Sequence, residues 1–139
     1  MYKLAALGAV LFFMFIAWII FLADSGSSSI FFDFIRTLLY GDKFGHAGLF
    51  GLLTVLSIVA FKFKSFGVGK VKVYYGLVLV LLFAVVEELS QIFFPSRTFD
   101  LADLAADMAG MFVAVAICYF GSSFITISPS KDASSGADV

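Results

Sequence analysis

Long apolar runs separated by short polar segments dominate the hydropathy pattern of this chain. Four runs have the length of membrane-spanning helices: Leu4–Leu22, Phe44–Phe61, Val73–Phe94 and Leu101–Phe120. At about 1.5 Å per residue, a helix of about 20 residues crosses a hydrocarbon core about 30 Å thick. A cleaved signal peptide is the alternative for the first run, but such a peptide normally has an apolar core of only about 7–15 residues. We therefore expect an all-α, polytopic membrane protein with four transmembrane helices.

Two segments outside these runs have patterns of their own. A Ser- and Gly-rich linker, Asp24–Ser29, leads into Ile30–Tyr40, where apolar residues recur at helical spacing over a length too short to span. We expect a short interfacial helix between the first and second spans, or a helix packed over the end of the bundle. From residue 122 onward the composition turns polar and small, which predicts a transmembrane domain over 1–121 and a disordered cytoplasmic tail over 122–139.

The composition supports the membrane interpretation. Hydrophobic residues make up 62% of the chain, charged residues 14%, and the mean hydropathy is +1.07, whereas soluble domains are about a quarter charged. The formal net charge of −1 gives no indication of a nucleic-acid partner. The single cysteine, Cys118, excludes an intrachain disulfide and a multi-cysteine metal site, and its apolar neighbours predict a buried, inert thiol.

Lysines between the second and third runs predict the topology. This loop contains Lys62, Lys64, Lys70 and Lys72 and no acidic residue. By the positive-inside rule the loop is cytoplasmic, so four spans place both termini in the cytoplasm of a bacterial cell and the loops 24–43 and 95–100 outside the cytoplasmic membrane. Small residues in two runs predict close helix packing. They are Gly45, Gly48 and Gly51 in the second run, and Ala102, Ala106, Gly110 and Ala114 in the fourth.

Polar residues in the stretch Val86–Gly110 indicate a functional site. Glu87, Glu88 and Gln91 share one side of the third helix, because residues three and four apart are neighbours on a helix. Pro95 then favours a turn, and Asp100, Asp103 and Asp107 repeat this spacing on the fourth helix. A carboxylate inside a membrane span costs about 2.5–3.5 kcal/mol on insertion scales, so it normally pairs with a partner or lines a wet cavity.

A second polar group, Asp42, Lys43 and His46, opens the second run. The predicted topology brings both groups to the outer side of the membrane, which favours one common site. Each residue also has a structural alternative. Asp42 and Asp100 suit helix N-caps, Lys43 and Arg97 suit snorkelling anchors, and His46 and Gln91 suit polar contacts between helices.

The order and spacing of these residues resemble the VanZ-like family of small bacterial membrane proteins. The similarity rests on Asp42-Lys43-x-x-His46, then Glu88-x-x-Gln91-x-x-x-Pro95-x-Arg97, then Asp103 and Gly110. It covers about residues 41–110. Where that family often has an asparagine four residues after the aspartate, this chain has Asp107. The resemblance implies a four-helix membrane domain and a link to resistance against the glycopeptide teicoplanin. A broader similarity to proposed lipid head-group enzymes has also been argued.

Two hypotheses follow for the site, and whether the protein is an enzyme is open at this point. In the first, an enzyme acts on a lipid-linked phosphate or head group: His46 is the general acid/base, and Glu88 or Asp103 orients it. Lys43 and Arg97 hold the phosphate, with Gln91, Asp42, Asp100 and Asp107 as further binding residues. Asp100, Asp103 and Asp107 are candidate oxygen ligands for a divalent cation such as Mg²⁺.

In the second hypothesis the same residues form a non-catalytic module that binds a membrane lipid, a lipid-linked envelope precursor, an envelope partner or a glycopeptide. The chain has no GxSxG nucleophile motif. A small ion carrier is less favoured, because carriers usually have internal repeats with broken helices. Neither hypothesis identifies the ligand or the oligomeric state.

Overall fold

The computed structural model describes residues 2–25, 41–95 and 99–126. Its long helices are α1 (Tyr2–Asp24), α3 (Gly41–Ala60), α4 (Tyr75–Ser90), which a 3-10 turn η1 (Gln91–Phe93) extends, and α5 (Leu101–Thr126). Within the described residues, these four helices are long and apolar enough to cross a membrane. The predicted fold class, an all-α protein with four candidate transmembrane helices, is confirmed.

The structure differs from the predicted end of the fourth helix, and it does not describe two other predicted segments. The helix α5 continues to Thr126, so the boundary predicted after residue 121 falls inside a helix. Apolar residues continue as far as Ile125 and Ile127, which is why the helix extends beyond the point where serines first appear. The interfacial helix predicted over Ile30–Tyr40 and the tail residues 127–139 lie outside the described residues.

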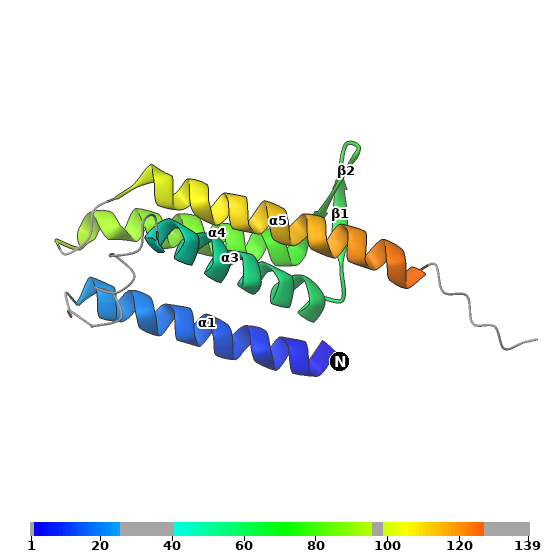
Figure 1. Cartoon of the computed structure of the whole chain (residues 1–139), viewed down its shortest axis with the longest axis horizontal. Coiled ribbons are helices and arrows are strands. Elements are labelled where there is room, and N and C mark those ends of the chain that lie inside the picture. The colour runs from blue at the N-terminus through cyan, green and yellow to red at the C-terminus, as the bar shows by residue number, and fades with distance from the viewer. Residues whose placement is uncertain (1, 26–40, 96–98, 127–139) are drawn as a thin grey trace, which may run out of the picture.

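Helices α3, α4 and α5 pack together, and α1 lies along α3 (Figure 1). The most extensive helix contact joins α3 to α5. Buried side chains from all four helices meet in one apolar core, formed by Ile16, Phe50, Leu53, Val80, Ala84 and Met111. A smaller cluster of Ile58, Tyr74 and Cys118 closes the other end. The thiol of Cys118 is buried there, as predicted.

Glycine allows α3 and α5 to approach each other closely. A Cβ on Gly110 would lie 2.0 Å from the carbonyl oxygen of Ala47, and one on Gly51 would lie 3.0 Å from the carbonyl oxygen of Gly110. The predicted packing role is confirmed for these two glycines. It is wrong for Gly45 and Gly48, where an added Cβ would meet no described atom within 4 Å. Residues three apart do not lie on one straight line along a helix. Those two glycines therefore lie beside the contact with α5 and not in it.

A β-hairpin that the sequence interpretation missed occupies the loop between α3 and α4. Strand β1 (Ser65–Val68) pairs antiparallel with β2 (Val71–Tyr74). Gly69 has φ +63°, and a glycine at the first of two turn residues is typical of a type II′ hairpin turn. The alternation Val71-Lys72-Val73 after Gly69-Lys70 was the available signal. The third span accordingly begins at Tyr75, and not at Val73 as predicted.

Backbone hydrogen bonds at the end of α3 turn the chain into this hairpin. Phe63 N–H donates to Ile58 C=O and Lys62 N–H donates to Val59 C=O, both at 2.9 Å, which is the paired arrangement of a Schellman motif. Lys62 has φ +56° at the position where such motifs require a left-handed residue. Phe63 also packs against the cluster that contains Ile58, and an apolar contact usually accompanies the motif.

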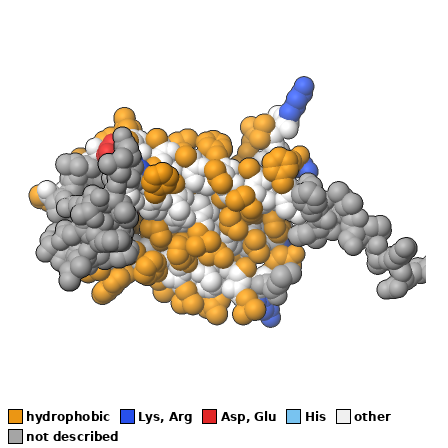
Figure 2. Space-filling model, in the orientation of Figure 1, with side chains coloured by type: hydrophobic (Ala, Val, Ile, Leu, Met, Phe, Trp, Pro, Cys, Tyr) orange, Lys and Arg blue, Asp and Glu red, His pale blue; other side chains and the backbone are white. Residues whose placement is uncertain are grey.

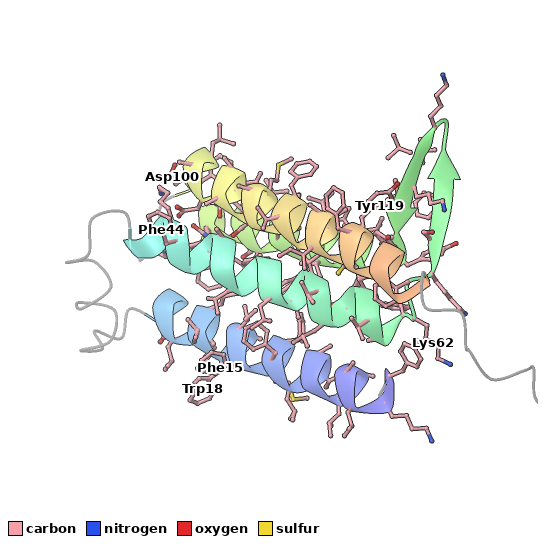
Figure 3. All side chains as sticks on the ribbon, turned by 45° about the vertical axis from the view of Figure 1, so that its right-hand side comes forward. Phe15, Trp18, Phe44, Lys62, Asp100 and Tyr119 are labelled. Carbon is pink, nitrogen blue, oxygen red and sulfur yellow. The ribbon has the colours of Figure 1, made fainter. Side chains whose placement is uncertain are left out.

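The two ends of the bundle differ in charge. The hairpin end has lysines on β2 and at the end of α3, and Lys62 Nζ lies 5.6 Å from the ring centroid of Tyr2, so the start of α1 is at this end too. Asp100 is at the opposite end, beside the start of α3 (Figure 3). Between the ends, apolar side chains cover the visible face of the helices (Figure 2). That distribution suits a lipid-facing surface, because lipid tails contact such side chains without cost.

The contact at Gly110 generates the first testable prediction. Gly110→Ala should destabilise the protein by about 1–3 kcal/mol, because its Cβ must push α5 away from the Ala47 backbone. The matched control is Gly121→Ala on the same helix, where a Cβ meets no described atom within 4 Å. Equilibrium unfolding of both variants in detergent or bilayer discs measures the difference. Equal stability of the two variants would contradict the proposed close contact.

Candidate functional site

A histidine and two aspartates form the centre of the polar end of the bundle. His46 lies in the second turn of α3, and Asp103 and Asp107 lie one turn apart on the facing side of α5. His46 Nδ1 is 3.0 Å from Asp107 Oδ1, and His46 Nε2 is 4.0 Å from Asp103 Oδ2. The side chain of Asp107 is fully buried, whereas that of His46 is about one-fifth exposed. The buried aspartate therefore holds one ring nitrogen, and the other faces the more accessible Asp103.

Aromatic stacking also restrains the imidazole ring of His46. Phe50, one turn further along α3, stacks nearly parallel to it, with ring centroids 6.2 Å apart and planes 7° apart. Phe83 of α4 stacks in turn on Phe50, with centroids 5.7 Å apart. An aromatic layer thus separates the polar end from the apolar interior of the bundle, and it limits the orientations open to His46.

Lys43 links the start of α3 to the start of α5. Its Nζ donates to Asp100 Oδ2 at 2.9 Å and to Asp103 Oδ1. Asp100 also accepts a 2.8 Å hydrogen bond from the Ala102 N–H at Oδ1, so it is the N-cap of α5 as the structural alternative predicted. These two bonds, the one from Lys43 first, hold the pKa of Asp100 below its usual range. Lys43 is thus a partner of aspartates in this structure.

Glu88 connects α4 to the start of α5. It is fully buried, and its Oε1 accepts a 2.8 Å hydrogen bond from the Asp100 N–H. Its Oε2 accepts from Gln91 Nε2 at 3.0 Å, and the same nitrogen donates to Glu87 Oε1 at 3.0 Å. Glu88 therefore positions the α5 N-terminus. The residue in contact with His46 Nδ1 is Asp107, whereas the described bonds of Glu88, which one hypothesis placed beside His46, go to Asp100 and Gln91.

Asp107 Oδ2 and Gln91 Oε1 are buried oxygen atoms without a hydrogen-bond partner among the described residues, on side chains that are 0% and 1% exposed. The assignment of the Gln91 amide is clear, because turning it over would place its oxygen against two carboxylates. Both atoms are acceptors, so what they lack is a donor. A buried acceptor without a donor is costly.

Two other predicted site residues, Asp42 and Arg97, lie partly or wholly outside the described part of the chain. The backbone of Asp42 lies in the first turn of α3, but its side chain is outside the described part, as is all of Arg97. Among the described residues, no group of three His, Cys, Asp or Glu is arranged to hold a metal ion. The expectation that Asp100, Asp103 and Asp107 bind Mg²⁺ therefore has no support in the geometry. These carboxylates take Lys43 and His46 as partners instead.

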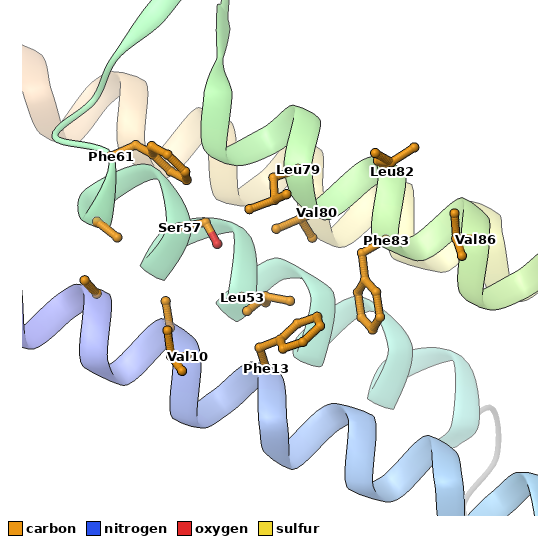
Figure 4. Close-up of a pocket in the computed structure, with 13 residues that line it drawn as sticks. Val10, Phe13, Leu53, Ser57, Phe61, Leu79, Val80, Leu82, Phe83 and Val86 are labelled. Carbon is orange, nitrogen blue, oxygen red and sulfur yellow. The ribbon is translucent and has the colours of Figure 1, made fainter.

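An apolar groove of about 640 Å³ lies between α1, α3 and α4, on the inner side of the aromatic layer (Figure 4). Phe13, Leu53, Ser57 and Phe83 line its wall. Leu79, Leu82 and Val86 form its edge on α4 and are half-exposed or more, so the groove opens toward the lipid-facing surface. Among the described residues of its lining, Ser57 alone has a hydroxyl group. The sequence carries no signature of this groove, because its lining comes from three separate helices.

The lowered pKa of Asp100 generates a prediction with a definite sign. A carboxyl whose folded pKa lies below the unfolded value, about 3.9, stabilises the fold above that pH. The contribution is lost as the pH falls through the folded pKa. Lys43→Met should raise the pKa of Asp100 toward the ordinary value, because the largest cause of its depression is removed. Carboxyl ¹³C NMR titration measures this.

The control for that titration is Lys72→Met, on the β-hairpin at the opposite end of the bundle. It should leave the pKa of Asp100 unchanged. If Lys43→Met also left it unchanged, the N-terminus of α5, and not the lysine, would be the group that depresses it.

With this geometry in view, the chain was compared with known proteins. Residues 4–124 match the family model described as VanZ/LLP1, which is the family that the spacing of the polar residues suggested. No curated protein and no solved structure gives a significant match. The match spans all four described helices except for a few residues at the two ends. The chain is therefore an integral membrane member of the VanZ/LLP1 family.

Proposed function

We propose that this protein acts on the head group of a membrane lipid or a lipid-linked envelope precursor, at the outer end of its helix bundle. The observation that carries the proposal is the contact between His46 Nδ1 and the buried Asp107 at 3.0 Å. An aspartate on one ring nitrogen fixes the tautomer and leaves the other nitrogen able to take a proton, as in other histidine general bases. His46 Nε2 is that nitrogen.

The surroundings of Nε2 suit proton transfer. When His46 takes a proton there, the resulting imidazolium has a carboxylate on each side: Asp107 at Nδ1 and Asp103, 4.0 Å from Nε2. A neighbouring negative charge favours the protonated ring. General acid/base catalysis of this kind contributes about 10²–10⁴-fold to a rate. In this proposal Asp103 still orients His46. Asp107, which the sequence suggested as a binding residue, is instead a residue that positions the ring of His46.

The described contacts of His46 also restrict the nucleophile. Its polar contacts are to Asp103 and Asp107, and no described serine or cysteine is among them. Ser90 donates instead to the carbonyl oxygen of Glu87 at 2.6 Å, and Cys118 lies in the cluster at the opposite end of the bundle. The nucleophile in this proposal is therefore water or a substrate hydroxyl, whose proton passes to Nε2. The reaction is hydrolysis or transfer of a head group.

The apolar groove supports a lipid as the substrate. Its edge residue Val86 directly precedes Glu87, and its wall residue Phe83 lies beneath the polar end through its contact with Phe50. A lipid with its tail along the groove would thus have its head group near the charged side chains. The groove opens on the side where lipid tails are present, so a lipid enters it without crossing water.

The orientation of the site is part of the proposal. Lysines mark the hairpin end, and the polar site is at the other end of the bundle. The positive-inside rule then places the hairpin in the cytoplasm and the site at the outer surface of the bacterial cytoplasmic membrane. Head groups of the outer leaflet and lipid-linked precursors exposed there are the substrates within reach.

Mass spectrometry of lipids tests the catalytic proposal. Purified protein is incubated with bacterial lipid extract in vesicles, with and without Mg²⁺. The wild type should produce a head-group species of altered mass. His46→Ala should reduce its rate by at least about 10²-fold, while Gly121→Ala, distant from the site, should keep it. Circular dichroism checks that each variant is folded. Turnover that survives His46→Ala would remove the histidine from this role.

Non-catalytic binding of a head group, an envelope partner or an antibiotic is the second candidate function. It is favoured by the absence of any serine or cysteine among the described contacts of His46. In this case a lipid co-purifies with the wild type, and no species of altered mass appears with or without Mg²⁺.

The family resemblance extends to antibiotic susceptibility under either proposal. Expression of the wild type in a teicoplanin-susceptible bacterium should raise the inhibitory concentration of teicoplanin, and His46→Ala should abolish the increase. Gly121→Ala, expressed at the same level in the membrane, should behave as the wild type. An increase that is the same for His46→Ala would show that the polar site has no part in it.

A further inference from the structure

A continuous chain of polar contacts joins the three helices at the polar end, and two of its side chains carry a buried acceptor without a described partner. It starts at Gln91, passes through Glu88 to the backbone of Asp100, and crosses to α3 through Lys43. It returns through Asp103 to His46 and finishes at Asp107. Gln91 Oε1 and Asp107 Oδ2 are buried acceptors without a partner among the described residues. Each interior member has partners on both sides.

We infer that the head group bound at this site carries a primary ammonium group, of the ethanolamine kind, which supplies N–H donors to these acceptors. The inference rests on the proposed function, because it names the chemical class of the head group recognised there. Asp107 Oδ2 is the principal acceptor, since it belongs to a carboxylate and a hydrogen bond to a charged group is the stronger kind.

The balance of charge supports a cationic ligand. Five carboxylates take part in the site, namely Glu87, Glu88, Asp100, Asp103 and Asp107, and the described cations are Lys43 and, when protonated, His46. Counting Arg97 as well would still leave more carboxylates than cations. Three of these carboxylates, Glu87, Glu88 and Asp107, are buried, and buried negative charge is unfavourable unless a cation compensates it. An ammonium group does so and an added phosphate does not.

Lys43 argues against a site built mainly for an anion. Its ammonium group already donates to two carboxylates, one from the N-cap of α5 and one from the next turn. Releasing it to a phosphate would leave Asp100 and Asp103 without their lysine. Asp107 Oδ2 and Gln91 Oε1, by contrast, have no donor among the described residues to give up when a ligand donor binds.

Three lipid head groups show whether the site recognises N–H donors or positive charge alone. Phosphatidylethanolamine offers a cation with N–H donors, phosphatidylcholine offers a cation without them, and phosphatidylglycerol offers no cation. Purified wild type is equilibrated with an equimolar mixture of the three, all with the same acyl chains, and the retained lipids are quantified by native mass spectrometry. Phosphatidylethanolamine should be retained about tenfold over each of the others, the ratio expected for one hydrogen bond to a charged group.

Two variants locate the preference. Asp107→Asn, which removes the charge on the open acceptor, should bring the three lipids to within about twofold of one another. Leu82→Ala, at the edge of the apolar groove, should lower total lipid retention and leave the ratio unchanged.

Free phosphoethanolamine, added as a competitor, separates a lipid-borne amine from a soluble one. Displacement of the lipid by millimolar competitor would show that the amine alone suffices, and no displacement would show that the acyl chains are needed as well.

Equal retention of phosphatidylcholine and phosphatidylethanolamine by the wild type would overturn the inference, and so would a preference for phosphatidylglycerol. These outcomes are read on the wild type, so a poorly folded Asp107→Asn leaves the test intact. Failure of the inference is distinct from failure of the proposed function. Turnover without ethanolamine preference removes only the inference, whereas ethanolamine preference without turnover removes only the catalysis.

Discussion

The pairing of charges between α3 and α5 inside an otherwise apolar bundle is the interaction on which this structure depends. Asp107 is fully buried, and a buried carboxylate is stable only when a partner compensates its charge. His46 is that partner, and it reaches Asp107 because α3 and α5 approach closely where Gly110 meets the Ala47 backbone. Packing and electrostatics therefore depend on each other. A wider separation of the two helices would leave both the histidine and the aspartate without compensation.

Glu88 gives the site its second support. It accepts a hydrogen bond from the backbone of Asp100, so the end of α4 determines where α5 begins. Asp100 in turn caps α5 and accepts from Lys43. The buried carboxylate of Glu88 thus fixes the position of Asp100 at the start of α5. The cost of burying Glu88 is offset by two hydrogen bonds, one from a backbone N–H and one from Gln91.

The molecule combines two environments that a lipid would also combine. The end with His46 is charged, whereas the groove between α1, α3 and α4 has an almost wholly apolar lining. Stacked Phe50 and Phe83 separate the two. This layer keeps the polar network away from the lipid tails, where a loose hydrogen bond would be costly. The groove runs from Phe83 toward the hairpin end, where Ala60 and Phe61 line it.

Local pattern alone determined much of this protein. Span lengths, the gathering of polar residues around Glu88 and His46, and the use of Gly51 and Gly110 for packing follow from hydropathy and helical spacing, which act within one segment. Only the tertiary structure decided that Asp107 pairs with His46, that Glu88 binds the backbone of Asp100, and that three helices enclose a groove. Helical spacing shows which residues share a face. The partner across the interface depends on how far each helix is rotated and shifted against its neighbour, and close packing at Gly110 sets that relation.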